Sequence, residues 1–330
     1  MSRSTDVLGY YEVAEHSGGF GNVINNIIYG LIIAFATKRT PCFIKGAHSD
    51  YLQYLKPALG IDLHSSCPPG LPRVSYDGSH PIPTEVDTEV ISGDTFNWTP
   101  DSDAEPTIWL KQHFESRKIQ YDRLLACISH DLLNPTQAIL EESNYLRTRT
   151  LRTETFSIGV HVRTSDREMA LNQNVSERRK LVALEMGASV RSSCLTHEKL
   201  VERVKRLVER FESHRQATDK RQVTIFVAGD HDIGKTLWAQ GSINDILGAN
   251  VEIIFRKGTP LHSGRGDRSV SQHNVSRSQL QLLGEFFLLT EVDVFIPNCR
   301  LRCHNYRCGN TFAFNIKLRR KFFEDRLAVN

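Results

Sequence analysis

The side chains best suited to chemistry lie in the segment 157–168 (SIGVHVRTSDRE), where an apolar run gives way to charged residues. The run predicts a buried strand of an α/β sheet, with His161 near its end and Arg163 and Asp166 after it. Open α/β sheets bind ligands outside the carboxyl ends of their strands. Because a guanidinium donates two parallel hydrogen bonds to phosphate, the segment suggests a nucleotide or nucleotide-sugar site. A solvated Arg–Asp loop pair is the alternative interpretation, and this segment alone leaves both open.

A glycine-rich turn at residues 17–22 (SGGFGN) is the second candidate. It follows a predicted strand at about 6–13 and opens a predicted helix at about 23–37, with another predicted strand at 41–45. Glycines between a strand and a helix are typical of a βαβ unit. The turn is either purely structural, because glycine permits the bend, or it presents backbone N–H groups to an anion or sugar.

Residues 229–236 (GDHDIGKT) formally match the P-loop pattern and follow a predicted strand. However, Asp230 and Asp232 would place carboxylates where backbone N–H groups should hold phosphate. Asp293 alone offers a clear acidic strand end for Mg²⁺ in the remaining chain. We therefore favour another use of Asp230, which is to accept hydrogen bonds from a base or ribose.

The composition is that of a globular protein, with 40% hydrophobic and 24% charged residues and a net charge of +3 over 330 residues. No Lys/Arg block with interleaved aromatics occurs, so we expect no nucleic-acid partner. The longest apolar stretch, at 27–36, is too short to cross a bilayer and predicts a buried helix. The N-terminus lacks a signal-peptide core, so we expect a soluble cytoplasmic protein with no membrane segment, or a secretory one if an anchor or signal was removed.

The seven cysteines favour a reducing compartment or incomplete pairing, because their number is odd and four are scattered. Cys299, Cys303, His304 and Cys308 lack the paired Cys-x-x-Cys spacing of structural zinc sites. A local disulfide or free thiols are therefore expected there, and no metal site.

Strands and helices alternate in both halves of the chain, which predicts an α/β fold of two Rossmann-like domains facing a cleft, at residues 1–150 and 151–330. Asn134-Pro135 predicts a helix start, residues 64–106 predict long loops with short strands, and residues 264–278 predict a loop. The second half further predicts helices at about 200–211, 279–290 and 312–327, and strands at 223–228, 251–255 and 292–297.

Four pieces of the chain together resemble the motifs of GDP-fucose-dependent fucosyltransferases, particularly the protein O-fucosyltransferases. They are Gly19, Phe20, Gly21 and Asn22 at the glycine turn; His161, Arg163 and Asp166; Asp230, at the end of residues 226–230; and Asn310, Thr311 and Phe312, after residues 293–299. In that family the arginine holds the diphosphate of GDP-fucose, an Asp contacts the nucleotide and the final hydroxyls lie near the phosphates. Asn310 departs from the family's Ser, Thr164 stands where some branches carry a second Arg, and residues 300–307 form an insertion.

The resemblance implies a GT-B-like inverting fucosyltransferase that needs no metal or other cofactor. The C-terminal domain would bind GDP-fucose and the N-terminal domain would contact a glycan or protein acceptor. Arg163 would stabilise the departing diphosphate, and Glu15 and His16, just before the glycine turn, are the candidate bases. A P-loop kinase or NTPase, or a non-catalytic glycan- or nucleotide-binding module, are the alternatives.

Overall fold

The computed structural model of the chain divides into two compact units, which are described here separately. The first comprises Met1–Ala138, Ser263–Ser269 and Arg302–Asn330, and the second comprises Ile139–His262 and Val270–Leu301. The structure describes residues 9–13, 20–43, 53–57, 61–63, 65–76, 90–93, 105–162, 195, 197–214, 221–229, 238, 241–248, 250–256, 272–299, 303–304, 307–308 and 311–327.

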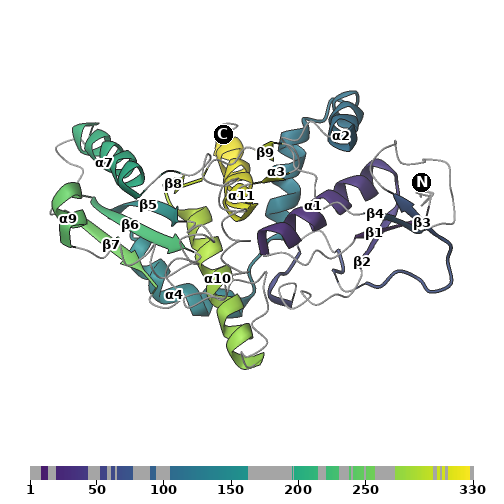
Figure 1. Cartoon of the computed structure of the whole chain (residues 1–330), viewed down its shortest axis with the longest axis horizontal. Coiled ribbons are helices and arrows are strands. Elements are labelled where there is room, and N and C mark those ends of the chain that lie inside the picture. Colours follow the sequence, from purple (N-terminus) through teal and green to yellow (C-terminus); the bar gives the residue numbers. More distant parts are fainter. Residues whose placement is uncertain are drawn as a thin grey trace, which may run out of the picture. The chain divides into compact units, whose positions relative to one another are not determined.

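The first unit contains a parallel four-stranded sheet in the order β2-β1-β4-β3 (Figure 1). Its strands are β1 (Tyr10–Val13), β2 (Thr40–Phe43), β3 (Arg73–Tyr76) and β4 (Val90–Gly93). The chain runs from β1 to β2 on one side and later places β4 on the other side of β1. The order of the strands therefore reverses at β1, whose carboxyl end leads into the glycine turn.

Helix α1 (Phe20–Ala36) is the centre of the first unit and is buried along almost its whole length. It packs on β1 and β2 and on the helices α2 (Glu105–Glu115), α3 (Tyr121–Leu132) and α11 (Thr311–Leu327). Contact with a sheet and three helices explains why its sequence is apolar nearly all round. The prediction of a buried helix at 27–36 is confirmed.

A disulfide joins Cys42 in β2 to Cys67, and the Phe43 N–H donates to the Ser65 carbonyl at 2.9 Å beside it. Cys299 is also disulfide-bonded, whereas Cys127 is half-buried and takes part in no disulfide. Of the two expectations, the Cys42–Cys67 bond disagrees with a reducing compartment, because disulfides persist mainly in oxidising ones. Incomplete pairing agrees with Cys127, which is in no disulfide.

The second unit contains a parallel sheet in the order β7-β6-β5-β8. Its strands are β5 (Thr155–Val162), β6 (Gln222–Gly229), β7 (Val251–Phe255) and β8 (Val294–Pro297). Counted along the chain, this is the 3-2-1-4 order of a Rossmann fold. The predicted α/β class, with a parallel sheet in each half, is confirmed.

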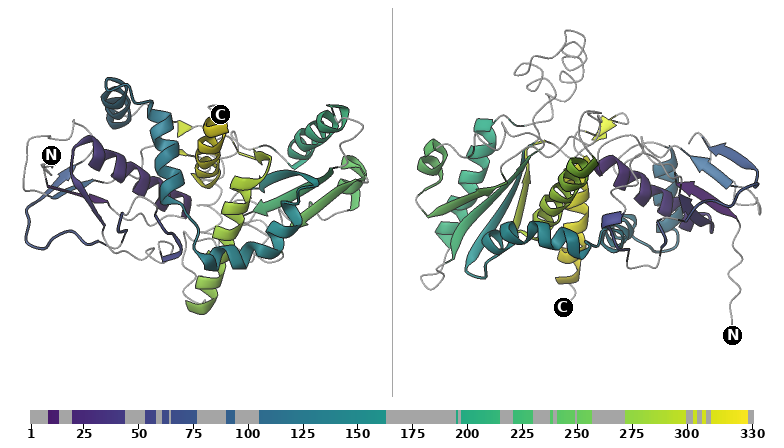
Figure 2. Two further views of the ribbon diagram at one scale, coloured as in Figure 1. Left: turned by 180° about the vertical axis from the view of Figure 1, so that it is seen from behind. Right: turned by 90° about the horizontal axis from the view of Figure 1, so that it is seen from below.

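Helices cover both faces of this second sheet (Figures 1 and 2). On one face, α7 (His197–His214) and α9 (Gly241–Leu247) share a core with alternate residues of β5 and β6. On the other face, α10 (Gln272–Glu291) approaches so closely that only a glycine fits at position 159, where a Cβ would lie 2.7 Å from Leu289 Cδ2. Because both faces of β5 are covered by helices, its inward-pointing residues on either face are apolar, and its sequence is apolar throughout.

Three features of the structure differ from the sequence expectations. Helix α4 (Gln137–Thr150) starts after Asn134-Pro135, because Pro135 pairs with Leu55 in an isolated bridge and the Thr136 N–H donates to the Tyr54 carbonyl at 3.1 Å. The loop predicted at 264–278 is wrong from Gln272 onward, where α10 has begun. The units also differ from a division at residue 150, because α4 lies in the second unit and α11 in the first.

The contact of α1 with β1 gives a prediction at Gly30. A Cβ at this position would lie 2.6 Å from Val13 Cγ2 and 2.8 Å from Val13 Cγ1. Alanine stabilises a helix by about 1 kcal/mol relative to glycine, whereas the clash costs about 1–3 kcal/mol. A net loss of stability in Gly30→Ala would therefore come from the clash. We expect Gly30→Ala to lower the melting temperature in wild type and to be tolerated with Val13→Ala. An equal loss in both backgrounds, measured by thermal unfolding, would contradict this contact.

The disulfide of the first unit gives a second prediction. It closes a loop with a sequence separation of 25 residues, which the chain-entropy model values at about 3–4 kcal/mol. The double variant Cys42→Ser/Cys67→Ser should melt several degrees below wild type without reductant. Reductant should then lower the melting temperature of wild type more than that of the variant. An equal drop in both proteins would refute a stabilising role for this disulfide.

Candidate functional site

The carboxyl ends of β5, β6 and β8 meet at one edge of the second sheet. His161 is paired with Ala228 of β6 and Pro297 of β8, and Val162 is paired with Gly229. The order of the strands reverses between β5 and β8, and nucleotides bind at such switch points in open α/β sheets. The His161 position is therefore at the place where this fold binds a ligand.

Asn298 holds this edge together through its backbone. Its N–H donates to the His161 carbonyl at 3.0 Å, and its carbonyl accepts from the Leu195 N–H at 2.7 Å. Both His161 and Asn298 are 5% exposed. The end of β5 is thus held by a backbone hydrogen bond beyond the paired residues of β8.

The opposite edge of the sheet holds Asp293, whose Oδ2 accepts from the Ser157 N–H at 2.7 Å and from the Ser157 hydroxyl at 2.8 Å. The Asp293 N–H donates back to the Ser157 Oγ at 3.0 Å. Asp293 precedes β8 and Ser157 is near the start of β5, so this carboxylate is at the amino edge. It cannot serve as the acidic strand end that a P-loop at residues 229–236 requires for Mg²⁺.

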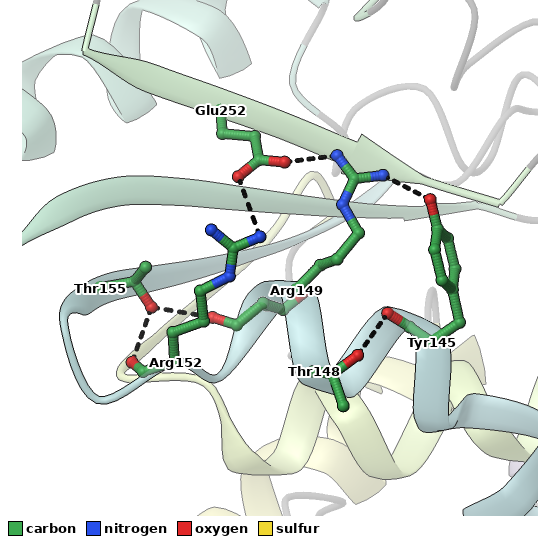
Figure 3. A network of polar contacts seen from close by, with 7 residues as sticks. Tyr145, Thr148, Arg149, Arg152, Thr155 and Glu252 are labelled. Atoms are coloured by element: carbon green, nitrogen blue, oxygen red, sulfur yellow. Dashed lines mark hydrogen bonds and ion pairs between the residues drawn. The ribbon is translucent and has the colours of Figure 1, made fainter.

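A polar network also lies at the amino edge, where the end of α4 meets β7 (Figure 3). Arg149 forms an ion pair with Glu252 and donates to the Tyr145 hydroxyl at 2.8 Å, and Arg152 lies 3.9 Å from Glu252. These contacts join α4 to the sheet on the side away from His161. We interpret them as structural.

In the first unit, the starts of α1 and α11 lie together, although they are almost 300 residues apart in the sequence. The Phe20 and Phe312 rings meet edge to face, 6.3 Å between centroids. Asn315 Nδ2 donates to the Gly21 carbonyl at 3.1 Å and to Asn25 Oδ1 at 2.9 Å. The structure therefore brings the glycine-turn motif and the closing motif into contact, as two helix N-termini that favour negative charge.

Two titratable groups, Tyr121 in the first unit and His197 in the second, have shifted pKa values. Burial raises the pKa of the Tyr121 hydroxyl, although a hydrogen bond with Tyr29 of α1 acts in the opposite direction. Burial also lowers the pKa of His197, which packs edge-on against the fully buried Trp238. Tyr121 thus stays protonated and His197 neutral at pH 7, in keeping with roles in packing.

The described residues include only part of the predicted site. His161 ends β5, Phe20, Gly21 and Asn22 form the first turn of α1, and Thr311 and Phe312 begin α11. The remaining predicted site residues lie outside the described residues: Glu15, His16, Gly19, Arg163, Asp166, Asp230 and Asn310. Their roles stay predictions.

Two residues near the site were not singled out from the sequence, Asn298 and Asn315. Asn298 directly follows the predicted strand 292–297, so the rule that ligands bind at strand ends could have found it. Asn315 is four residues after Thr311, one helical turn further. An amide among apolar residues of a helix was the available signal.

Comparisons with known proteins were made by sequence and by structure. No protein-family model and no curated protein matches the sequence. A structure of Arabidopsis thaliana FUT1 in complex with GDP matches with a TM-score of 0.53 at 12% identity, over 94% of this chain and 68% of that one. POFUT1 in complex with GDP matches with a TM-score of 0.50 at 14% identity, over 96% of each chain. The chain has the fold of these fucosyltransferases.

A third similar structure, NodZ alpha-1,6-fucosyltransferase soaked with GDP-fucose, has a TM-score of 0.49 at 12% identity, over 94% of this chain and 91% of that one. The matches to FUT1 and POFUT1 confirm the predicted Rossmann-like α/β fold. Among the helices that the structure describes, none has the length and apolar character needed to span a membrane.

The amino-edge contact of Asp293 gives a prediction. Asp293→Ala removes the acceptor for two Ser157 donors, one of them the backbone N–H of a buried residue. We expect a loss of about 1–2 kcal/mol in the free energy of unfolding, with no change in the response to Mg²⁺. Thermal unfolding with and without Mg²⁺ checks this. A rise in melting temperature with Mg²⁺ that disappears in Asp293→Ala would instead assign a metal-binding role.

Proposed function

We propose that this protein is a GDP-fucose-dependent fucosyltransferase that transfers fucose to a hydroxyl of a glycan or protein acceptor. The observation that carries the proposal is the switch point between β5 and β8, in a chain with the fold of FUT1 and POFUT1. Arg163 is the next residue after β5, and Asp230 is the next after β6. These two residues match positions that bind the nucleotide sugar in the family. Each therefore directly follows one of the two paired strand ends at this edge.

In the proposed reaction, an acceptor oxygen forms a bond to the anomeric carbon of fucose while the bond from that carbon to the GDP oxygen breaks. The electron pair of the broken bond goes to the diphosphate, and the configuration at the anomeric carbon inverts. Arg163 neutralises charge that grows on the diphosphate in the transition state, so it accelerates the chemical step. The acceptor proton goes to Glu15, to His16 or to a phosphate oxygen of the leaving GDP.

We further propose that the second unit binds the nucleotide sugar, since it holds the Rossmann switch point. The first unit would supply most acceptor contacts. By the family resemblance it would also contribute donor contacts, from Phe20–Asn22 of α1 and from Thr311 and Phe312 of α11, because helix N-termini favour a negatively charged group such as the diphosphate. The diphosphate charge is met by protein groups in this scheme, and we propose that no metal or other cofactor is needed. The cellular compartment of the protein depends on where its acceptor is found. The proposal names that acceptor as a glycan or a protein.

The P-loop alternative is not favoured. Its Mg²⁺ would need an acidic strand end on the edge that carries residues 229–236, and Asp293 lies at the opposite edge against Ser157. Lys235 nevertheless offers a matched control for the experiment, because it is the residue on which a P-loop enzyme depends and a fucosyltransferase does not.

Calorimetric titration with GDP, GDP-fucose and Mg-ATP tests the proposal on wild type, Arg163→Ala and Lys235→Ala. We expect micromolar GDP binding that persists in EDTA, because the arginine and not a metal meets the diphosphate. Arg163→Ala should weaken that binding at least tenfold, by loss of a bidentate charged contact, and Lys235→Ala should leave it unchanged. Turnover in Arg163→Ala should fall by about a hundred- to a thousandfold.

The opposite pattern would contradict the proposal. Mg-ATP binding that survives in Arg163→Ala and disappears in Lys235→Ala would assign a P-loop enzyme. GDP binding with no turnover of any donor would assign a non-catalytic nucleotide-binding module.

A further inference from the structure

Asn315 makes a polar contact between α11 and α1. Its side chain is fully buried, at 0% exposure, and its Nδ2 donates to the Gly21 carbonyl at 3.1 Å and to Asn25 Oδ1 at 2.9 Å. Asn25 is itself 5% exposed. An amide pair in a dry helix interface needs an explanation, because packing alone would be served by an apolar residue.

The two acceptors of Asn315 indicate that this amide pair sets the register of α11 along α1. They do not indicate that it is there to increase stability. In an α-helix, each carbonyl already accepts from the N–H four residues on, so the bond to Gly21 is not needed to complete α1. Buried polar pairs contribute little net stability compared with apolar packing, and their best-attested effect is to select one register. The Asn315 amide meets its acceptors only when α11 sits at one height along α1.

That register determines how the two helix starts meet. Phe312 is three residues before Asn315, and Thr311 is four, so both lie within one turn of it on neighbouring positions. Gly21 lies between Phe20 and Asn22 in the first turn of α1. The Phe20–Phe312 ring contact, 6.3 Å between centroids, therefore depends on the same alignment.

We propose that Asn315 is a positioning residue for the donor substrate. By bonding to Gly21 and Asn25, it holds the first turn of α1 against the first turn of α11. This role rests on the proposed function, because the donor is the ligand that the aligned turns would contact. A shift of α11 by one residue moves its first turn by about 1.5 Å, and a misplacement of about 1 Å can cost roughly a hundredfold in activity.

The test compares Asn315→Leu with a matched control on the same helix, Arg319→Met. Leucine keeps the branched shape and the number of heavy atoms of the Asn315 side chain and removes both bonds. Arg319 is 6% exposed, and its Nη1 donates to the His130 carbonyl of α3 at 2.9 Å, so the control removes a partly buried bond of α11 to α3 instead of α1. For each protein, we would measure the GDP dissociation constant, the melting temperature and amide hydrogen exchange over residues 20–25.

Only Asn315→Leu should weaken GDP binding, by at least tenfold, and speed exchange at residues 20–25. Its melting temperature should change no more than that of Arg319→Met. Equal effects of both variants on GDP binding would mean that Asn315 only helps α11 to pack, as Arg319 does. That result would overturn the proposal. Unchanged GDP binding and exchange in Asn315→Leu would also overturn it.

The proposed function fails separately, if wild type binds no GDP. The donor role of Asn315 would then be refuted with it. Faster exchange in Asn315→Leu alone would still show that this residue holds the first turn of α1, and unchanged exchange would refute that as well.

Discussion

The pairing of β5 with β8 is the constraint on which the second unit depends. Because β8 adds to β5 on the side opposite β6, the order of strands reverses there, which is where open α/β sheets bind their ligands. The Asn298 N–H continues the ladder to the His161 carbonyl. This single extra hydrogen bond keeps the strand ends level at the edge where a ligand would bind.

The two edges of that sheet have different tasks. The amino edge is joined by side-chain contacts, including the Asp293–Ser157 bonds and the Arg149–Glu252 ion pair. Near the carboxyl end of β7, Arg256 pairs with Glu142 of α4 at 2.7 Å. The polar side chains that stabilise the unit are thus placed so that the ends of β5, β6 and β8 are held by backbone pairing.

The sequence predicted the strands well where burial on both faces made them apolar, as for β5, β6 and β7. It failed at residues 272–278, because a polar, basic start gave α10 no apolar periodicity until Gln279. It also failed at Asn134-Pro135, where pairing with Leu55, distant in sequence, overrides a local helix-start signal. Local patterns cannot report such long-range partners.

The candidate site was predictable in the same uneven way. The positions of His161 near a strand end and of Phe20–Asn22 at a helix start were predicted, because strand ends and glycine turns leave short-range signals. That the closing motif at Thr311 and Phe312 packs against α1 was not predicted, since nothing near residue 311 indicates the partner. The contact of Asn315 with Gly21, 294 residues away in sequence, illustrates why spacing alone could not have shown it.

The position of α11 has a consequence for synthesis on the ribosome. The first unit includes residues that are made before the second unit and residues, Arg302–Asn330, that are made after it. During translation, α1 therefore exists for a time without the helix that covers its first turn, while all segments of the second unit up to Leu301 are already available. Domains usually fold in the order of their synthesis. In this protein the N-terminal unit begins first and is completed last, which leaves the apolar surface of α1 to be protected in the interval.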